Sequence, residues 1–257
     1  MKHYFMKSIT FLVLAFLLMI APACKKDSKR RIQKFHRQEV GYSANDILSD
    51  KKYKSISVEI IYMAGFKPTD QAIDNLKQLI TSTCNKPDGI RLVFKEIGAQ
   101  GKTSYSIDDV KTLESDNREE FTYKKDLAVC FLFLDGPSNE NQGSSMVLGH
   151  AYYNTSMVIY EKSLKDNSGG FGEPELYKLE TAVINHEFGH ILGLVNLGSV
   201  MYNLHQDAAH GSHCDNSNCL MYWEVETGSI FSNLVGNTPI PVFDQNCLRD
   251  LHENGGK

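Results

Sequence analysis

The sequence lacks three features that would each point to a particular class of protein. It has no excess of basic residues, because 27 Lys and Arg are outnumbered by 31 Asp and Glu. The resulting formal net charge of −4 argues against a nucleic-acid partner. The apolar run Ile9–Ile20 is too short for a membrane-spanning helix, which needs about 20 apolar residues. There is also no internal repeat. The 257 residues, 42% of them hydrophobic, suffice for one core or for two lobes that share a cleft.

The first 24 residues have the pattern of an export signal. Lys2 and Lys7 precede the apolar run, and the small residue Ala23 stands immediately before Cys24. This ending resembles a bacterial lipoprotein signal, in which the cysteine carries the lipid; an ordinary secretory signal cut near Ala23 is the alternative. Both predict export, and the first predicts a membrane-anchored protein in the periplasm or on the cell surface. Residues 25–52 are polar, so we expect a flexible tether there.

From residue 53 onward, strand and helix patterns alternate. We expect strands at 55–64, 90–97 and 126–135, one or two more within 147–162, and helices at 70–84, within 106–120 and from near Pro174. This order predicts an α/β (α+β) domain over 53–257. Its upper lobe would be 53–193. Residues 194–257 are rich in Asn, His and Gly, and we expect them to form an irregular lower lobe.

The last predicted helix carries a metal-binding pattern. His186 and His190 are four residues apart, so a helix places both imidazoles on one face. Glu187 lies beside the first histidine, where a carboxylate can take a proton from a metal-activated water. A catalytic zinc normally has three protein ligands and keeps one position for water. The pattern therefore predicts a hydrolytic zinc site that still needs a third ligand.

Two motifs around this helix resemble those of known zinc peptidases. Gly193 completes His-Glu-x-x-His-x-x-Gly, which resembles the metzincin clan, but Asn196 stands where most metzincins have the third ligand. Downstream, residues 213–221 fit His-Cys-x4-Cys-x-Met, which resembles the archaemetzincins. The resemblance implies that His213 is the third ligand, reached after a loop over 194–212. It also implies that Met221 belongs to the Met-turn below the zinc.

The same resemblance implies a fold and further roles. The fold would be a metzincin-like mixed twisted sheet with an antiparallel edge strand, followed by the active-site helix and an irregular C-terminal subdomain. We expect residues 149–160 to supply the edge strand, which in that family pairs with an extended substrate. Tyr222 is a candidate for support of the oxyanion. Within the loop, the competing ligands, or ligands of a second metal, are His205, Asp207 and His210.

Five cysteines follow Cys24, and an odd number leaves at least one unpaired or bound to metal. Archaemetzincins bind a structural zinc with four cysteines, which implies a second site here. Its candidate ligands are Cys214, Cys219, Cys247 and His252. In an oxidising compartment a disulfide among the three cysteines is the alternative.

These observations predict an exported zinc endopeptidase that acts as a monomer on a peptide or protein substrate. Zinc held by His186, His190 and His213 would activate water, with Glu187 as the general base. One alternative is a surface lipoprotein that binds a partner and cleaves nothing, in which a fourth protein ligand closes the zinc site. Another is a zinc amidase that acts on cell-wall material.

Overall fold

A five-stranded mixed sheet forms the centre of the folded unit, which comprises residues 38–257. The strand order is β2-β1-β3-β5-β4, and only the β4–β5 pair is antiparallel. The strands are β1 (Ser55–Met63), β2 (Ile90–Ile97), β3 (Asp126–Phe133), β4 (Gly149–Tyr153) and β5 (Ser156–Ile159). The predicted fold class, including the antiparallel edge strand, is confirmed. The edge strand is β4 alone, however, because β5 lies inside the sheet between β3 and β4.

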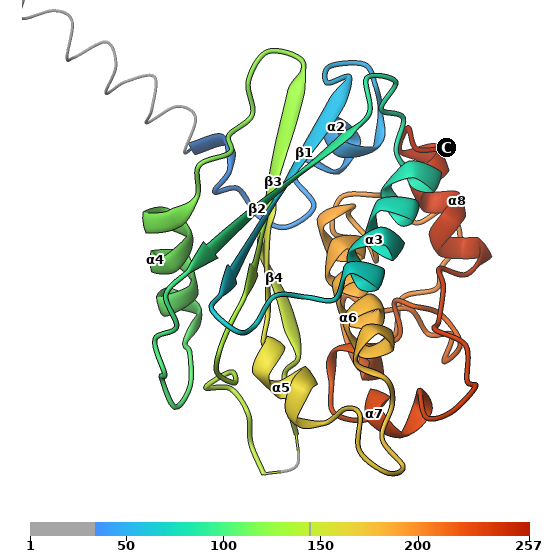
Figure 1. Ribbon diagram of the computed structural model, residues 1–257. Coiled ribbons are helices and arrows are strands. Elements are labelled where there is room, and N and C mark those ends of the chain that lie inside the picture. The colour runs from blue at the N-terminus through green and yellow to red at the C-terminus, as the bar shows by residue number, and fades with distance from the viewer. Residues whose placement is uncertain (1–33, 144) are drawn as a thin grey trace, which may run out of the picture. The chain divides into compact units, whose positions relative to one another are not determined.

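Helices cover both faces of this sheet. Figure 1 shows α4 on one side and α3, α6 and α8 on the other. The helices are α2 (Ala44–Leu48), α3 (Asp70–Thr83), α4 (Ile107–Asn117), α5 (Glu161–Asp166), α6 (Leu176–Ile191), α7 (Ile230–Asn233) and α8 (Gln245–Glu253), with a 3-10 helix η1 (Trp223–Glu226). Up to residue 193, the strands and long helices follow the predicted order.

The central strand β3 shows why the two-sided cover matters. From Leu127 to Phe133 every residue is fully buried, as expected of a parallel strand with helices on both faces. Phe131 packs edge-on against Phe188 of α6, with ring centroids 5.9 Å apart. Its neighbours Cys130 and Leu132 belong to a second apolar cluster that includes Val110 and Leu113 of α4. The core therefore fixes the position of α6 against the sheet.

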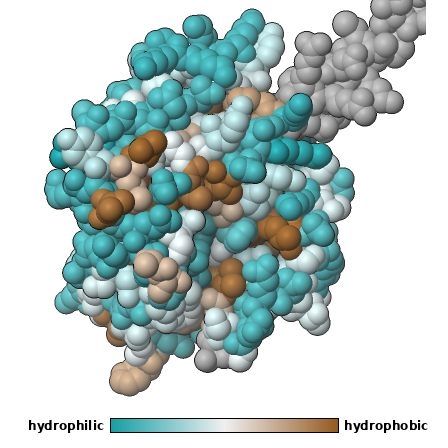
Figure 2. All heavy atoms as spheres, turned by 180° about the vertical axis from the view of Figure 1, so that it is seen from behind, coloured by the Kyte–Doolittle hydropathy of each residue, from teal (hydrophilic) through white to brown (hydrophobic). Residues whose placement is uncertain are grey.

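The structure, a computed structural model, describes residues 34–143 and 145–257. The predicted signal segment 1–24, with lipidation at Cys24, lies outside the described residues, as does the first part of the predicted tether. In the described part, no helix is long and apolar enough to cross a membrane. The face seen in Figure 2 is largely hydrophilic, and its apolar residues form small separate groups.

The prediction of a flexible tether up to residue 52 was wrong for residues 43–49. They contain the short helix α2, whose Ala44, Ile47 and Leu48 are buried. The ammonium group of Lys86 donates hydrogen bonds to three main-chain carbonyls around the end of α2, those of Asp46, Ser49 and Tyr53. The physical reason is that three buried apolar side chains and a lysine distant in sequence are enough to hold so short a helix. Such contacts leave no periodic pattern in the sequence.

Candidate metal centres

The helix α6 carries the first part of the candidate site. Its residues from Lys178 to Ile191 are all buried, so His186 and His190 point into the protein interior. Gly193 ends the helix with a positive φ of 86°, a conformation that glycine adopts without strain. A Cβ at this position would also collide with the main-chain nitrogen of Ser199. The chain can therefore turn sharply away from the helix directly after the two histidines.

The loop over 194–212 brings His213 back to α6. The main-chain N–H of Val195 donates to the carbonyl of Ser212 at 3.2 Å, which closes the loop at its base. Asn196, which occupies the usual metzincin ligand position, is exposed, and its amide donates to the Gln206 side chain at 3.4 Å. The His213 ring lies 5.3 Å from that of His186 and 5.2 Å from that of His190. The structure thus brings the three predicted histidines together.

All three imidazoles are oriented in the same way. The Nδ1 atoms of His186, His190 and His213 lie 2.7, 3.0 and 2.7 Å from the main-chain carbonyls of Leu220, Leu194 and His210. Because a carbonyl oxygen can only accept, each Nδ1 carries the proton. Each Nε2 then presents a lone pair to the centre of the group, as metal-binding histidines do.

The spacing of these Nε2 atoms fits a zinc ion. Those of His186 and His190 are 3.1 Å apart. Neighbouring ligands in a tetrahedron with bonds of about 2.1 Å lie roughly 3.4 Å from each other. The buried Nε2 of His213 makes no hydrogen bond. Burial and then the proximity of His186 lower the pKa of His190 to about 3, so this imidazole is neutral and can bind a cation.

The side chain of Glu187 extends from α6 to the edge strand β4. Its Oε2 accepts a hydrogen bond from the Ala151 main-chain N–H at 2.7 Å, while its buried Oε1 has no partner. Burial, and then the charge of Glu226, raises its pKa well above the usual value. One oxygen is thus held by β4, and the other is available to a proton donor. This is the arrangement that a general base requires.

Met221 packs against α6 at Gly189, the residue before His190. A Cβ added to Gly189 would collide with the Met221 sulfur, so the glycine allows this close approach. Met221 is fully buried, and its carbonyl accepts from the Cys214 main-chain N–H at 2.8 Å. Tyr222 follows it but is not among the described residues that line the cleft beside the histidines. Its candidate role at the oxyanion therefore has no support from its position.

The cleft next to the three histidines has a volume of about 350 Å³. Besides the site residues, its walls include Val40, His150, Ala151, Leu197, His210 and Ser212. His210 is held there by Asp207, 2.7 Å from its Nδ1, and by stacking on Trp223 with ring centroids 4.2 Å apart. Of the three competing ligands in the loop, His210 lines this cleft, whereas Asp207 and His205 do not.

Sequence reasoning missed Glu226, the last residue of η1. Its carboxylate oxygens lie 3.3 Å from Nε2 of His213 and 3.7 Å from Nε2 of His186. Burial works to raise the pKa of Glu226, but the two imidazoles outweigh it and hold the pKa below its usual value. Burial also works to lower the pKa of His213, but Glu226 outweighs it and the pKa is raised. No short motif contains Glu226, so the sequence held no signal for it.

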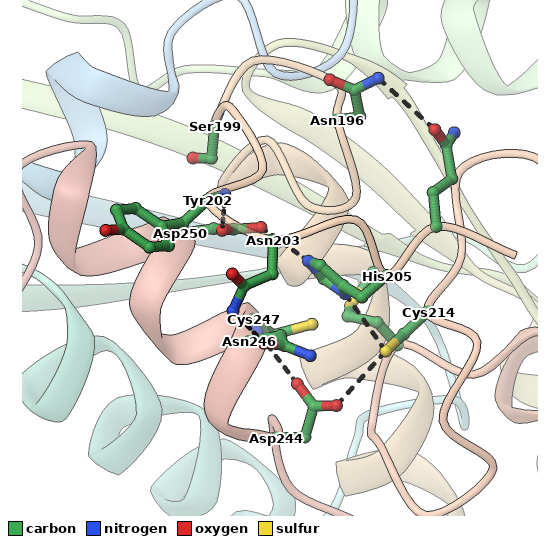
Figure 3. Close-up of polar contacts among 12 residues, drawn as sticks. Asn196, Ser199, Tyr202, Asn203, His205, Cys214, Asp244, Asn246, Cys247 and Asp250 are labelled. Atoms are coloured by element: carbon green, nitrogen blue, oxygen red, sulfur yellow. Dashed lines mark hydrogen bonds and ion pairs between the residues drawn. The ribbon is translucent and has the colours of Figure 1, made fainter.

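A second group of possible metal ligands lies in the C-terminal part of the chain. The ligand atoms of His205, Cys214, Asp244 and Cys247 all lie within 4.8 Å of one another. Figure 3 shows His205 between Cys214 and Asp250. Its Nδ1 is 3.4 Å from the Cys214 sulfur, and its Nε2 is 2.8 Å from Oδ2 of Asp250. A carboxylate behind a histidine is the usual support of a metal-binding imidazole.

Cys219 belongs to the same neighbourhood. Its sulfur is 3.6 Å from that of Cys247 and accepts main-chain N–H groups of Met221 and Asp244, each at 3.4 Å. Hydrogen bonds from Cys214 and Cys247, together with these N–H groups, lower its pKa to about 4. Cys219 is therefore stabilised as a thiolate, the form that binds zinc.

The choice of His252 for this second site was wrong, because its side chain is 66% exposed and lies beside Glu253. His205, from the loop over 194–212, occupies the corresponding place. The predicted alternative of a disulfide is also absent among the described residues, whose five cysteines are all free thiols. The group thus offers two sulfurs, one imidazole and one carboxylate, and the sulfur of Cys219 lies 3.6 Å from that of Cys247. Thiolates and imidazoles are the ligands of structural zinc sites.

A comparison with the solved structure of an archaemetzincin agrees with this architecture. The chain is similar to archaemetzincin from Methanopyrus kandleri, with a TM-score of 0.50 and 15% identity over 78% of this chain and 96% of that one. It is also similar to metalloproteinase-II from Bacteroides fragilis, with a TM-score of 0.41 and 12% identity over 80% of this chain and 56% of that one. No protein-family model and no curated protein sequence matches the chain. The chain thus has a metzincin-like fold and two candidate metal sites.

Proposed function

We propose that the protein is a zinc-dependent endopeptidase. The observation that carries the proposal is the convergence of three Nε2 lone pairs beside a buried carboxylate with one free oxygen, at the wall of a cleft. The three ligands are His186, His190 and His213. When bound, zinc would polarise the carbonyl of a peptide bond and make a water molecule more acidic.

The protein's own groups would handle the proton and the substrate. Oε1 of Glu187 would take the proton from the attacking water and pass it to the leaving amine. The Ala151 N–H would keep this carboxylate in position through its hydrogen bond to Oε2. The edge strand β4 would align an extended substrate, because within residues 34–143 and 145–257 its outer side pairs with no other strand. Met221 would support the helix face from below.

We propose a second, structural zinc at Cys214, Cys219, Cys247 and His205. Asp244 is the less suitable fourth ligand, because its Oδ1 accepts the Cys247 main-chain N–H at 2.9 Å and so caps α8. Soft thiolates also bind zinc better than a single carboxylate does.

Export and a lipid anchor at Cys24 remain predictions that rest on residues 1–24.

One observation favours a different function. Glu226 lies near the position that a hydrolytic zinc leaves to water, and a permanent fourth ligand would make this a zinc protein that binds a partner and cleaves nothing.

The decisive test compares the wild type with Glu187→Gln on a peptide library, with zinc content measured in parallel. The amide keeps the shape of the side chain but cannot act as a base. We expect zinc content to stay the same while turnover falls by about 10²–10⁴-fold. Equal cleavage by both proteins would reject Glu187 as the base, and no cleavage by either would favour the non-catalytic function.

A further inference from the structure

We infer that Glu226 is a displaceable fourth protein ligand of the catalytic metal, which closes the site until a substrate enters. The inference rests on the proposed function for its consequences, but not for the ligation itself. It names a ligand that the histidine motif does not contain and makes it the regulator of the same site.

The main chain directs Glu226 toward the histidines. The carbonyl of Glu226 accepts a hydrogen bond from the main-chain N–H of Leu148 at 3.0 Å, and Thr227 forms an antiparallel bridge with Val147. Both contacts tie the end of η1 to the segment that leads into β4. The carboxylate therefore enters the site from the rim of the sheet, on an anchored backbone.

The distances match a ligand position. Oε1 of Glu226 lies 3.3 Å from Nε2 of His213, and Oε2 lies 3.7 Å from Nε2 of His186. Both are close to the roughly 3.4 Å between neighbouring ligands of a tetrahedral zinc. All four ligand atoms, one from each of the three histidines and one from Glu226, lie within 4.8 Å of one another. The fourth corner of the tetrahedron is thus the place that Glu226 occupies.

An ordinary ion pair explains this arrangement less well. The Nδ1 proton of each imidazole already goes to a carbonyl, so an ion pair needs a second proton on Nε2. The Nε2 of His213 is nevertheless buried without a hydrogen bond, although Glu226 is 3.3 Å away. A cation between the four groups satisfies the lone pairs and the carboxylate together.

The two carboxylates of the site differ in how firmly they are held. Glu187 is 1% exposed and receives a main-chain hydrogen bond from β4. The Glu226 side chain is 28% exposed and lines the cleft. It can therefore turn toward solvent when the carbonyl of a substrate enters, while its backbone stays in place. Glu226 would lower activity at low substrate concentration and increase metal retention.

The test uses the full chain loaded with cobalt(II), whose visible absorption reports the number and type of ligands. Glu226→Gln is compared with Glu224→Gln, the same chemical change two residues earlier in η1. We expect Glu226→Gln to change the cobalt spectrum, to lower zinc affinity at least about tenfold in a chelator competition, and to raise peptide turnover several-fold. Glu224→Gln should match the wild type in all three measurements.

The outcomes separate the two proposals. An unchanged cobalt spectrum in Glu226→Gln would overturn the inference whatever the activity, because loss of affinity alone can come from removing a nearby charge. A changed spectrum with no cleavage by any variant would support Glu226 as a ligand and reject the peptidase. If Glu226→Gln does not fold, Glu226→Asp keeps the charge and shortens the reach, and should change the spectrum in the same way.

Discussion

The sheet lobe, up to residue 193, and the C-terminal lobe, residues 194–257, are held together by different physical means. The sheet lobe buries a whole strand, β3, between helices on both faces. The C-terminal lobe has only short helices, and its buried residues include a histidine, three thiols and the carboxylate of Asp250. Burial of polar groups stabilises a fold only when each has a partner. The first lobe thus depends on apolar packing, whereas the second adds a buried cluster of polar groups and thiols, which we propose is held together by a metal.

The proposed catalytic site contains residues from both lobes. The buried helix α6 supplies two of the candidate ligands and the candidate base. The C-terminal lobe gives His213, Met221 and Glu226 from loops and a 3-10 helix. We therefore expect the conformation of the C-terminal lobe to depend on the proposed second metal, and the geometry of α6 not to depend on it.

The largest expected effect comes from the apolar core. Phe131→Ala removes a fully buried ring that packs on Phe188, so we expect it to destabilise the protein by about 3–5 kcal/mol whether or not metal is present. Chemical denaturation with and without a chelator measures this. Phe94→Ala, at a ring that is 43% exposed, is the control and should cost much less. An equal loss in both variants would contradict the role given to the core.

The next effect concerns the second metal site. His205→Ala removes an imidazole that is 1% exposed, and we expect the affinity for the second zinc to fall by at least about 100-fold, or about 3 kcal/mol. Protease cleavage within 194–257 should increase while the sheet lobe stays intact. His252→Ala makes the same change at an exposed histidine and should retain two zinc ions per chain. Loss of zinc from this variant alone would restore the sequence-based assignment.

The smallest effect is expected at Asp250, whose carboxylate contacts the candidate ligand His205. Asp250→Asn keeps an oxygen for the Tyr202 main-chain N–H but removes the negative charge that orients His205. We expect zinc affinity at the second site to fall by about 10–100-fold, with an unchanged cobalt spectrum. Competition with a chelator of known affinity measures the change. An affinity equal to that of the wild type would show that packing alone positions His205.

The periodicity of apolar residues along the chain was enough to predict much of the sheet lobe and part of the candidate site. The periodic patterns of β1, α3 and β3 predicted their ranges to within two residues, since each spans several turns or pleats with a buried face. His186 and His190 were predictable for the same reason, because the helix repeat alone places them on one face. His213 was identified only through a motif that resembles a known family.

Tertiary structure decided the rest. His205 and His252 are the same residue type, and each lies within ten residues of a cysteine in the sequence. Only the path of the loop over 194–212 places His205 beside Cys214. Glu226 belongs to no motif, and its position depends on main-chain contacts with residues 147 and 148, which are distant in sequence. The sequence by itself therefore determined the helix that presents two candidate ligands and a candidate base. The fold decided which further groups meet them, because irregular chain is positioned by long-range contacts that leave no local period.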